Sequence, residues 1–178
     1  MLMLTIFMVG CSSIQLDDVS PTGKSFTGVW VLDFADSDEV PDLRNRVAKP
    51  RARLPGLSGG QSSNRSIRRP GAGSELSFVV HDFQVLGADK MEIEQGAQSM
   101  GIRYFPGVYR DVSWGERQRG LWEVVSGWEE DKLIIFSRAG SMQVHEAFTG
   151  NANRLSVVVT IEADDETFKY RRVFNRQG

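Results

Sequence analysis

The sequence predicts a mainly β protein, an antiparallel up-and-down meander of about nine strands that closes into a barrel. Apolar and polar residues alternate with a period of two through much of the chain after residue 90, as in Met91–Glu94 and Leu155–Ile161. Turn signals rich in Gly, Asp and Asn separate these runs. The connections are too short for the crossovers that parallel strands require, so neighbouring strands are antiparallel.

Eight of the expected strands follow one another towards the carboxyl end. They are residues 91–94, 100–104, 108–114, 119–129, 132–136, 142–149, 154–162 and 168–174. We expect the intervening turns at residues 96–99, 106–107, 115–118, 129–131, 139–141, 150–153 and 163–166. The run Lys132–Phe136 is largely apolar, which indicates burial on both faces of the sheet.

Two further elements precede these strands. Residues 26–34 predict a first strand, on which one face carries Phe26, Trp30, Leu32 and Phe34. Residues 74–86 predict one short helix that lies on the barrel or plugs one end. Its apolar face would carry Leu76, Val79, Phe83 and Leu86. Ser74 can cap this helix, although Phe78–Val80 also fits a strand.

The composition narrows the class of protein. A chain of 178 residues suits one domain with tails. Its hydrophobic content of 40% is enough to fill a core. The net charge of −2 argues against a nucleic-acid partner, and the single cysteine excludes an intrachain disulfide framework.

Residues 1–10 resemble a secretory signal peptide, since Met1–Val9 is almost wholly apolar yet too short to span a membrane. The sequence Met8-Val9-Gly10-Cys11 resembles the bacterial lipobox, although no Lys or Arg precedes the apolar run and Met8 stands where Leu is commonest. The resemblance implies cleavage before Cys11 and lipidation of Cys11. Ser12 then favours sorting to the periplasmic face of the outer membrane. The alternative is an apolar tail with a buried free cysteine.

Residues 11–24 are polar, with Pro and Gly, and predict a lipidated tether that leads into a domain of residues 25–178. Residues 36–73 interrupt this domain with four of the six prolines and five glycines, which predicts a long disordered loop. The loop is basic and has no acid between residues 43 and 74. Its charged side chains are Arg44, Arg46, Lys49, Arg51, Arg53, Arg65, Arg68 and Arg69.

This basic loop leaves 13 basic against 23 acidic side chains in the remainder of the chain. A segment of this kind can bind anionic lipid headgroups, with about 1 kcal/mol per basic residue near the surface. The alternative is a solvated loop whose charge is neutralised by the acidic barrel.

The pattern Gly28-x-Trp30 on the first strand resembles the lipocalin signature. In that fold the Trp closes the bottom of the barrel, and an Arg of the last strand packs over its ring, a contact worth about 0.5–2 kcal/mol. The resemblance implies these structural roles for Gly28, Trp30 and Arg172, with Arg171 as the other choice for the arginine. The alternative is a core Trp of any β protein.

No catalytic arrangement is evident in the sequence. His81 and His145 are the only histidines, and His145 and Glu146 point to opposite faces of their strand. There is no phosphate-binding loop, nucleophile elbow or metal-ligand spacing, and the aspartates at residues 33–38 are typical of a capped turn. We therefore expect no enzyme, no metal and no cofactor.

A binding cavity is the more attractive prediction, because a barrel of about eight strands can hold one small ligand. The candidate ligand-binding residues lie in the middle strands: Arg103, Tyr104, Tyr109, Arg110, Trp114, Trp122 and Trp128. The alternative is that these aromatic side chains fill the interior.

Several short segments of the sequence resemble an uncharacterised family of bacterial envelope lipoproteins with a lipocalin-like barrel. They are Met91–Gln95, Tyr109–Gly115, Gly120–Trp122, Gly127–Trp128 and Arg171–Phe174. The family brings no assigned activity. We therefore predict a non-catalytic, membrane-anchored protein that binds a small apolar or amphiphilic ligand or an envelope protein. The alternative is a packed module whose basic loop binds anionic membrane or polymer surfaces.

Overall fold

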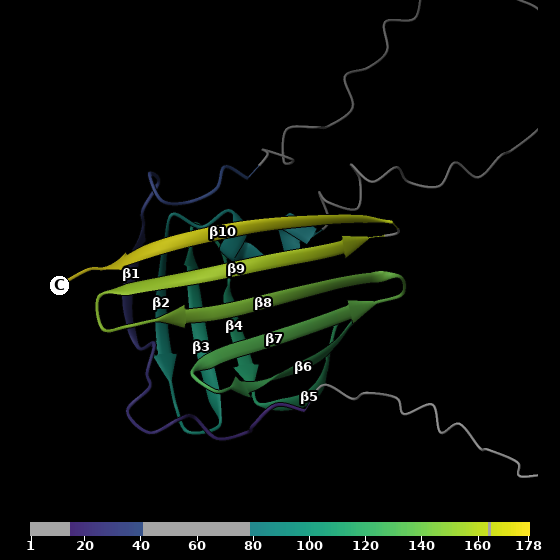
Figure 1. The fold of residues 1–178 in the computed structure, drawn as a ribbon, viewed down its shortest axis with the longest axis horizontal. Helices are drawn as coiled ribbons and strands as arrows, with labels where there is room; N and C mark the ends of the chain where they lie inside the picture. Colours follow the sequence, from purple (N-terminus) through teal and green to yellow (C-terminus); the bar gives the residue numbers. More distant parts are fainter. Residues whose placement is uncertain (1–14, 41–78, 164) are drawn as a thin grey trace, which may run out of the picture.

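The computed structural model describes residues 15–40, 79–163 and 165–178 (Figure 1). Ten antiparallel strands form one sheet in the order β4-β3-β2-β1-β10-β9-β8-β7-β6-β5. The strands are β1 Gly28–Leu32, β2 Lys90–Gln95, β3 Ser99–Phe105, β4 Tyr109–Ser113, β5 Gly115–Arg119, β6 Trp122–Glu129, β7 Lys132–Ala139, β8 Met142–Gly150, β9 Arg154–Ala163 and β10 Glu166–Arg176. The predicted antiparallel barrel is confirmed.

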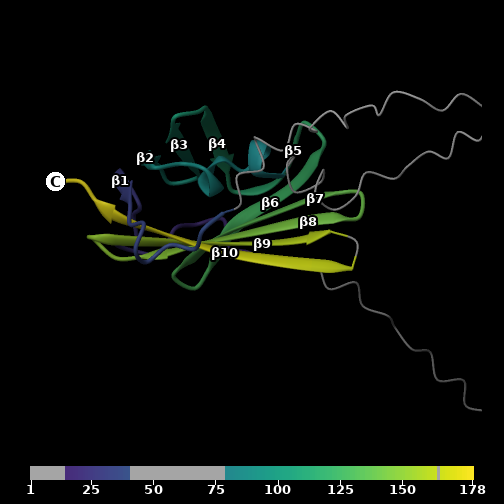
Figure 2. The same cartoon turned by 90° about the horizontal axis from the view of Figure 1, so that it is seen from above.

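The barrel is flattened and nearly closed. In Figure 2, β2, β3 and β4 form one layer over β7 to β10, and Figure 1 shows the strands of the two layers crossing steeply. The two strands at the ends of the sheet order, β4 and β5, follow each other in the chain. The barrel therefore has one seam, between β4 and β5, across which no strand ladder runs in the described residues.

The strand β5 corrects the prediction of a turn at residues 115–118. Gly115–Arg119 pairs with Trp122–Ser126 of β6, and the turn falls at Gly120 and Leu121, where Gly120 has a φ of 59°. The segment has no apolar side chain, so its alternation could not be recognised as a strand by hydrophobicity. It borders the seam, which is where a polar strand is tolerated. This extra strand raises the number from about nine to ten.

The segment between β1 and β2 ends in a short plug that we call the cap, residues 79–86. Residues 79–82 form one helical turn and η2, Gln84–Leu86, is a 3-10 turn. Val79, Phe83 and Leu86 are buried in the core, as the predicted helical face required. The rest of that predicted helix, residues 74–78, lies outside the described residues.

Trp30 is fully buried, and its Nε1–H donates to the main-chain oxygen of Phe26 at 2.8 Å. The guanidinium over its ring belongs to Arg176, at 4.9 Å from the centroid, and not to Arg172. Trp30 is paired with Arg176 in the β1–β10 ladder, a register that the sequence did not reveal. Gly28 has a φ of +147°, and a Cβ there would lie 3.1 Å from the Arg176 guanidinium carbon, so the glycine makes room for this arginine.

Arg172 holds a different place in the barrel. It is buried and donates to the main-chain oxygens of Asp38 and Ala88, at 3.1 and 3.5 Å. It therefore ties the segment after β1 to the segment before β2. Burial lowers the pKa of Arg172.

The first strand is shorter than predicted, because Asp33 ends it. Oδ1 of Asp33 accepts the N–H groups of Ala35 and Asp36, an Asx turn. Phe34, expected on the face of Trp30, is 72% exposed as a result. A hydrogen bond from the Asn175 amide lowers the pKa of Asp33.

Residues 15–24 lie across the end of the barrel opposite the cap, and we call them the strap (Figure 1). Asp17 pairs with Trp128 through two main-chain hydrogen bonds of 2.9 and 2.8 Å. Lys24 Nζ donates to the main-chain oxygen of Gly150 and to Asp131. The predicted tether, residues 11–24, is therefore docked on the barrel over the part that the structure describes.

The barrel interior is filled by side chains. Its fully buried aromatic residues are Phe26, Trp30, Phe83, Tyr104, Trp122, Trp128, Phe148 and Phe174. β9 contributes Leu155, Val157, Val159 and Ile161 on one face, as its alternation predicted. Lys132–Phe136 has three buried residues in a row, Leu133, Ile134 and Ile135, which agrees with burial on both faces.

We predict that Trp30→Ala lowers the free energy of unfolding by about 3–5 kcal/mol, because it empties a fully buried site and frees the Phe26 carbonyl. Chemical denaturation followed by circular dichroism measures the change. Phe34→Ala is the matched control on the same segment, and its effect should stay within about 0.5 kcal/mol because Phe34 is exposed. Equal effects of the two substitutions would contradict a core role for Trp30.

Candidate functional site

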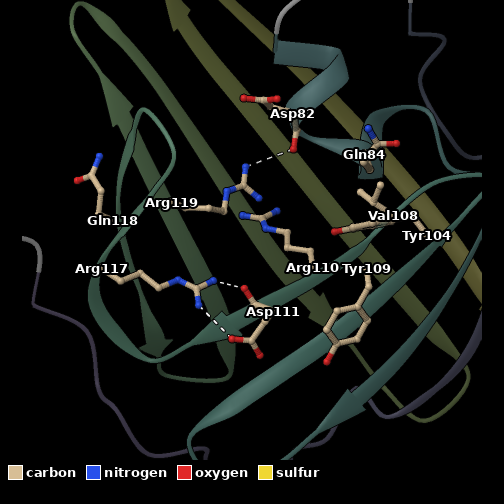
Figure 3. A pocket seen from close by; sticks show the side chains of 10 residues that line it. All are labelled: Asp82, Gln84, Tyr104, Val108, Tyr109, Arg110, Asp111, Arg117, Gln118 and Arg119. Carbon is tan, nitrogen blue, oxygen red and sulfur yellow. Dashed lines mark hydrogen bonds and ion pairs between the residues drawn. The ribbon is translucent and has the colours of Figure 1, made fainter.

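A pocket of about 320 Å³ lies where the cap meets the seam (Figure 3). It is lined by the cap, by the end of β3, by β4 and by β5. The lining residues are Asp82, Gln84, Tyr104, Val108, Tyr109, Arg110, Asp111, Arg117, Gln118 and Arg119. Three of these ten residues are arginines, and the local chemistry of each one differs.

Arg110 of β4 forms a buried ion pair with Glu146 of β8, on the far side of the barrel interior. Arg110 Nη1 donates to Glu146 Oε1 at 2.8 Å, and Arg110 Nη2 lies 2.8 Å from Glu146 Oε2. The side chains are 5% and 0% exposed. Burial alone would lower the pKa of Arg110, but the charge of Glu146 outweighs burial and raises it. This arginine is therefore a fixed positive charge.

Tyr104 lies beside this ion pair with a hydroxyl group that has no hydrogen-bond partner among the described residues. Burial raises the pKa of Tyr104 to about 12, although the charge of Arg110 opposes the rise. Arg110 offers only N–H donors, so it cannot accept the hydroxyl proton of Tyr104. The Nε–H of Arg110 is also without a partner in the described part of the chain. The pocket floor thus holds two buried donors that lack acceptors.

Arg119, at the end of β5, adds a third donor group. Its Nη2 donates to the main-chain oxygen of Asp82 at 3.3 Å, and no carboxylate of the described residues lies within ion-pair distance. Burial, and then the like charge of Arg110, lower the pKa of Arg119. The charged form of this half-buried side chain therefore lacks a counterion that it would gain from an anion in the pocket.

The cap is held over these arginines by specific contacts. Trp122 Nε1–H donates to Asp82 Oδ2 at 2.8 Å. The Phe83 ring packs edge-on against Trp122 at 5.0 Å, and the guanidinium carbons of Arg110 and Arg119 both lie 5.5 Å from its centroid. Phe83 therefore lies within cation–π distance of both arginines.

Side chains close the seam below the pocket. Arg117 of β5 reaches to β4 and donates to the main-chain oxygen of Asp111, while its Nη1 lies 3.2 Å from Asp111 Oδ2 (Figure 3). Further along, Ser126 Oγ donates to the main-chain oxygen of Ser113 at 2.7 Å. These bonds do part of what a strand ladder does elsewhere in the barrel.

This arrangement suits the binding of an anionic group. The Tyr104 O–H and the Arg110 Nε–H lie without acceptors beside Arg119. Arginine pairs well with carboxylate or phosphate oxygens. The rim carries apolar surface, since Val108 and Tyr109 are 58% and 59% exposed. Among the described residues no group of His, Cys, Asp or Glu is placed to hold a metal ion. The arrangement can therefore hold an anionic head with an apolar part at the mouth.

The structure divides the predicted ligand-binding set into three groups. Tyr104, Tyr109 and Arg110 line the pocket, and Trp122 adjoins it through Asp82 and Phe83.

The other members of the set lie elsewhere. Trp114 and Trp128 pack edge-on at 6.0 Å near the strap, and Trp128 also stacks on Phe26 at 5.6 Å. Arg103 lies on the outer face of the barrel, with its Nε 3.9 Å from Glu92. These three residues take no part in the pocket.

Other pocket residues were not singled out from the sequence, chiefly Asp82, Gln84, Arg117 and Arg119. Glu146, the partner of Arg110, was also missed. A signal for Glu146 existed, because it stands between Val144 and Phe148 on the inward face of its strand. An acid at such a position requires a buried cation as its partner.

The other predicted sites fall on residues that the structure does not describe. They are Cys11 and the basic set Arg44, Arg46, Lys49, Arg51, Arg53, Arg65, Arg68 and Arg69. Their roles stay predictions. No helix in the described part of the chain is long and apolar enough to cross a membrane.

The fold and site define a ten-stranded antiparallel barrel with a polar pocket at its seam. No protein-family model and no curated protein matches the sequence. Among solved structures, the chain is similar to a secretory abundant heat soluble (SAHS) protein from Ramazzottius varieornatus, with a TM-score of 0.48 and 13% identity over 88% of this chain and 98% of that chain.

A second similar structure is a variant of the fluorescent protein UnaG, with a TM-score of 0.48 and 17% identity over 86% of this chain and 96% of that chain. Both similarities are distant. The resemblance to an envelope lipoprotein family stays a prediction.

We predict that Glu146→Gln costs about 3–5 kcal/mol of stability, because it leaves the buried Arg110 without a counter-charge. Chemical denaturation measures the cost. The matched control is Glu123→Gln, which breaks the exposed Arg138–Glu123 pair and should cost about 0–1 kcal/mol. The double substitution Arg110→Met and Glu146→Leu should recover most of the loss, and a failure to do so would show that the two charges are not coupled.

Proposed function

We propose that this chain is a non-catalytic binding protein whose seam pocket takes the anionic head of a small amphiphilic ligand. The observation that carries the proposal is a pair of buried donors without acceptors at the pocket floor, the Tyr104 hydroxyl and the Arg110 Nε–H. The Arg119 guanidinium lies beside them and has no carboxylate of the described residues within ion-pair distance. Buried donors without acceptors are costly, and an incoming carboxylate or phosphate supplies the acceptors.

The position of the pocket favours a head group over a wholly apolar ligand. Aromatic and aliphatic side chains pack the barrel interior, whereas the pocket offers charged groups with Val108 and Tyr109 at its rim. A carboxylate on a short alkyl chain fits both parts. Of the two ligand classes that the sequence predicted, apolar and amphiphilic, we therefore propose the amphiphilic one.

The test is a calorimetric titration with octanoate, with octanol as the uncharged control of the same chain length. Octanoate should bind and octanol should bind far more weakly. Arg119→Met should weaken octanoate binding by about ten- to a hundredfold, since a bond to a charged group is worth about 1.5–3 kcal/mol.

Arg103→Met is the matched control, because Arg103 lies outside the pocket on the outer face. It should leave the affinity for octanoate unchanged. Equal binding of octanoate and octanol, or equal losses in the two variants, would contradict an anion site.

We further propose that lipidated Cys11 anchors the barrel at the periplasmic face of the bacterial outer membrane. The support is the sequence Met8-Val9-Gly10-Cys11 after a short apolar run, followed by Ser12. A chain with several acyl groups on one residue is held stably, since each buried methylene contributes about 0.8 kcal/mol.

The anchor predicts that cells expressing the chain incorporate radiolabelled palmitate into it, and that Cys11→Ala abolishes the incorporation. Fractionation should place the wild-type chain with outer membranes and the variant in the soluble fraction. Label that persists in Cys11→Ala would show that the acyl group is elsewhere.

A further inference from the structure

The strap joins the proposed anchor to one particular end of the barrel. Asp17 is bound to Trp128 at the end where β6 turns into β7, and Lys24 reaches Asp131 in that turn. Gln95, at the end of β2, donates to the Ser20 hydroxyl and to the main-chain oxygen of Lys24. Three strand ends are thus tied to the strap.

The contact between strap and barrel is a close one. A Cβ on Gly127 would lie 2.6 Å from the main-chain oxygen of Asp17 and 2.8 Å from the Cβ of Leu16. Any larger residue at position 127 must therefore push the strap away. The strap side of β6 is built to receive a polypeptide backbone.

The pocket lies towards the other end. Trp122, which bonds the cap beside the pocket, and Trp128, which bonds the strap, are both on β6. They are separated by six residues, or about 20 Å along the strand. In Figure 1 the cap lies at the top of the barrel, and the strap runs along the bottom.

The chain between the anchor and the strap is short. Asp17 is the sixth residue after Cys11, so the two residues lie at most about 22 Å apart even in a fully extended chain. The strap end is therefore held close to any bilayer that carries the acyl chains of Cys11.

We infer that the strap makes its own end of the barrel the membrane-proximal face and turns the arginine pocket to the aqueous side. The ligand head then comes from solution and not from a lipid of the anchoring bilayer. This inference rests on the proposed lipid anchor and on the proposed anion site. It adds that the ligand enters the site from the aqueous side.

The orientation is tested with the full lipidated chain in phosphatidylcholine vesicles that contain acceptor-labelled lipid. One variant carries a donor dye at His81→Cys on the cap, where the side chain is 85% exposed. The other carries it at Gln98→Cys, in the exposed β2–β3 turn at the strap end. Energy transfer to the bilayer should be stronger from residue 98 than from residue 81.

Gly127→Val in each labelled chain should abolish this difference, because the strap no longer docks. Lys24→Ala is a second way to loosen the strap without a change inside the barrel. Equal transfer from both positions, or stronger transfer from residue 81, in the chain with Gly127 intact would overturn the inference.

The source of the ligand is tested with octanoate on the same vesicles. In high salt, which screens the surface potential that would otherwise repel octanoate from an anionic bilayer, its affinity should be the same whether the anchoring bilayer is phosphatidylcholine alone or includes phosphatidylglycerol. Weaker octanoate binding on the anionic bilayer in high salt would show that lipid headgroups enter the pocket, which overturns the inference.

The possible failures are distinguishable. A chain that binds no octanoate even in detergent removes the anion site, while the two energy-transfer values still decide the orientation. A Cys11 that carries no acyl group by mass spectrometry removes the proposed anchor, and the inference fails with it. A lipidated chain that binds octanoate but shows equal transfer overturns the inference alone.

Discussion

The barrel depends on one geometric constraint: its two terminal strands, β4 and β5, face each other without a ladder between them. Nine strand pairings hold the remainder, but the seam must be closed by side chains. Arg117 and Ser126 do this along its lower part, and the cap covers the upper part. The pocket exists because the seam is closed by long side chains and not by main-chain bonds.

The same constraint explains why charged residues enter an otherwise apolar barrel. A buried guanidinium needs a carboxylate as its counterion. Glu146 on β8, across the barrel interior, pairs with Arg110 on β4 in this way. Both carboxylate oxygens of Glu146 lie 2.8 Å from a nitrogen of Arg110. The Tyr104 hydroxyl and the Arg110 Nε–H, which lie beside the pair, have no acceptor among the described residues.

Much of the fold could be predicted because the alternation of apolar and polar residues along a strand shows which of its faces points into the barrel. β9, with four apolar residues at every second position, and β7, with its apolar run, were both located correctly. β5 was missed because its polar residues, Glu116 to Arg119, carry no such signal. The arginine over Trp30 was misassigned because the sequence does not show how β1 and β10 are aligned. In the structure Trp30 pairs with Arg176, which lies four residues after Arg172.

The candidate site was predicted only in part, for a related reason. Tyr104 and Arg110 stand at inward positions of their strands and could be found one strand at a time. Glu146, the partner of Arg110, lies 36 residues further along the chain, and Asp82 lies 40 residues before its partner Trp122. Only the closed barrel brings these residues together. Aromatic side chains were a poor guide to the pocket. Trp128, for example, stacks on Phe26 and pairs with the strap, away from the pocket.

The composition of β5 has a consequence for how molecules of this protein meet one another. An unpaired strand edge invites a second chain to add to the sheet, and long flat apolar edges do so most readily. β5 is five residues long, presents Glu and Arg in place of apolar side chains, and has one arginine folded over towards β4. Its edge is therefore a poor template for intermolecular sheet growth, and the barrel can leave this strand edge without a ladder at little risk of forming fibres.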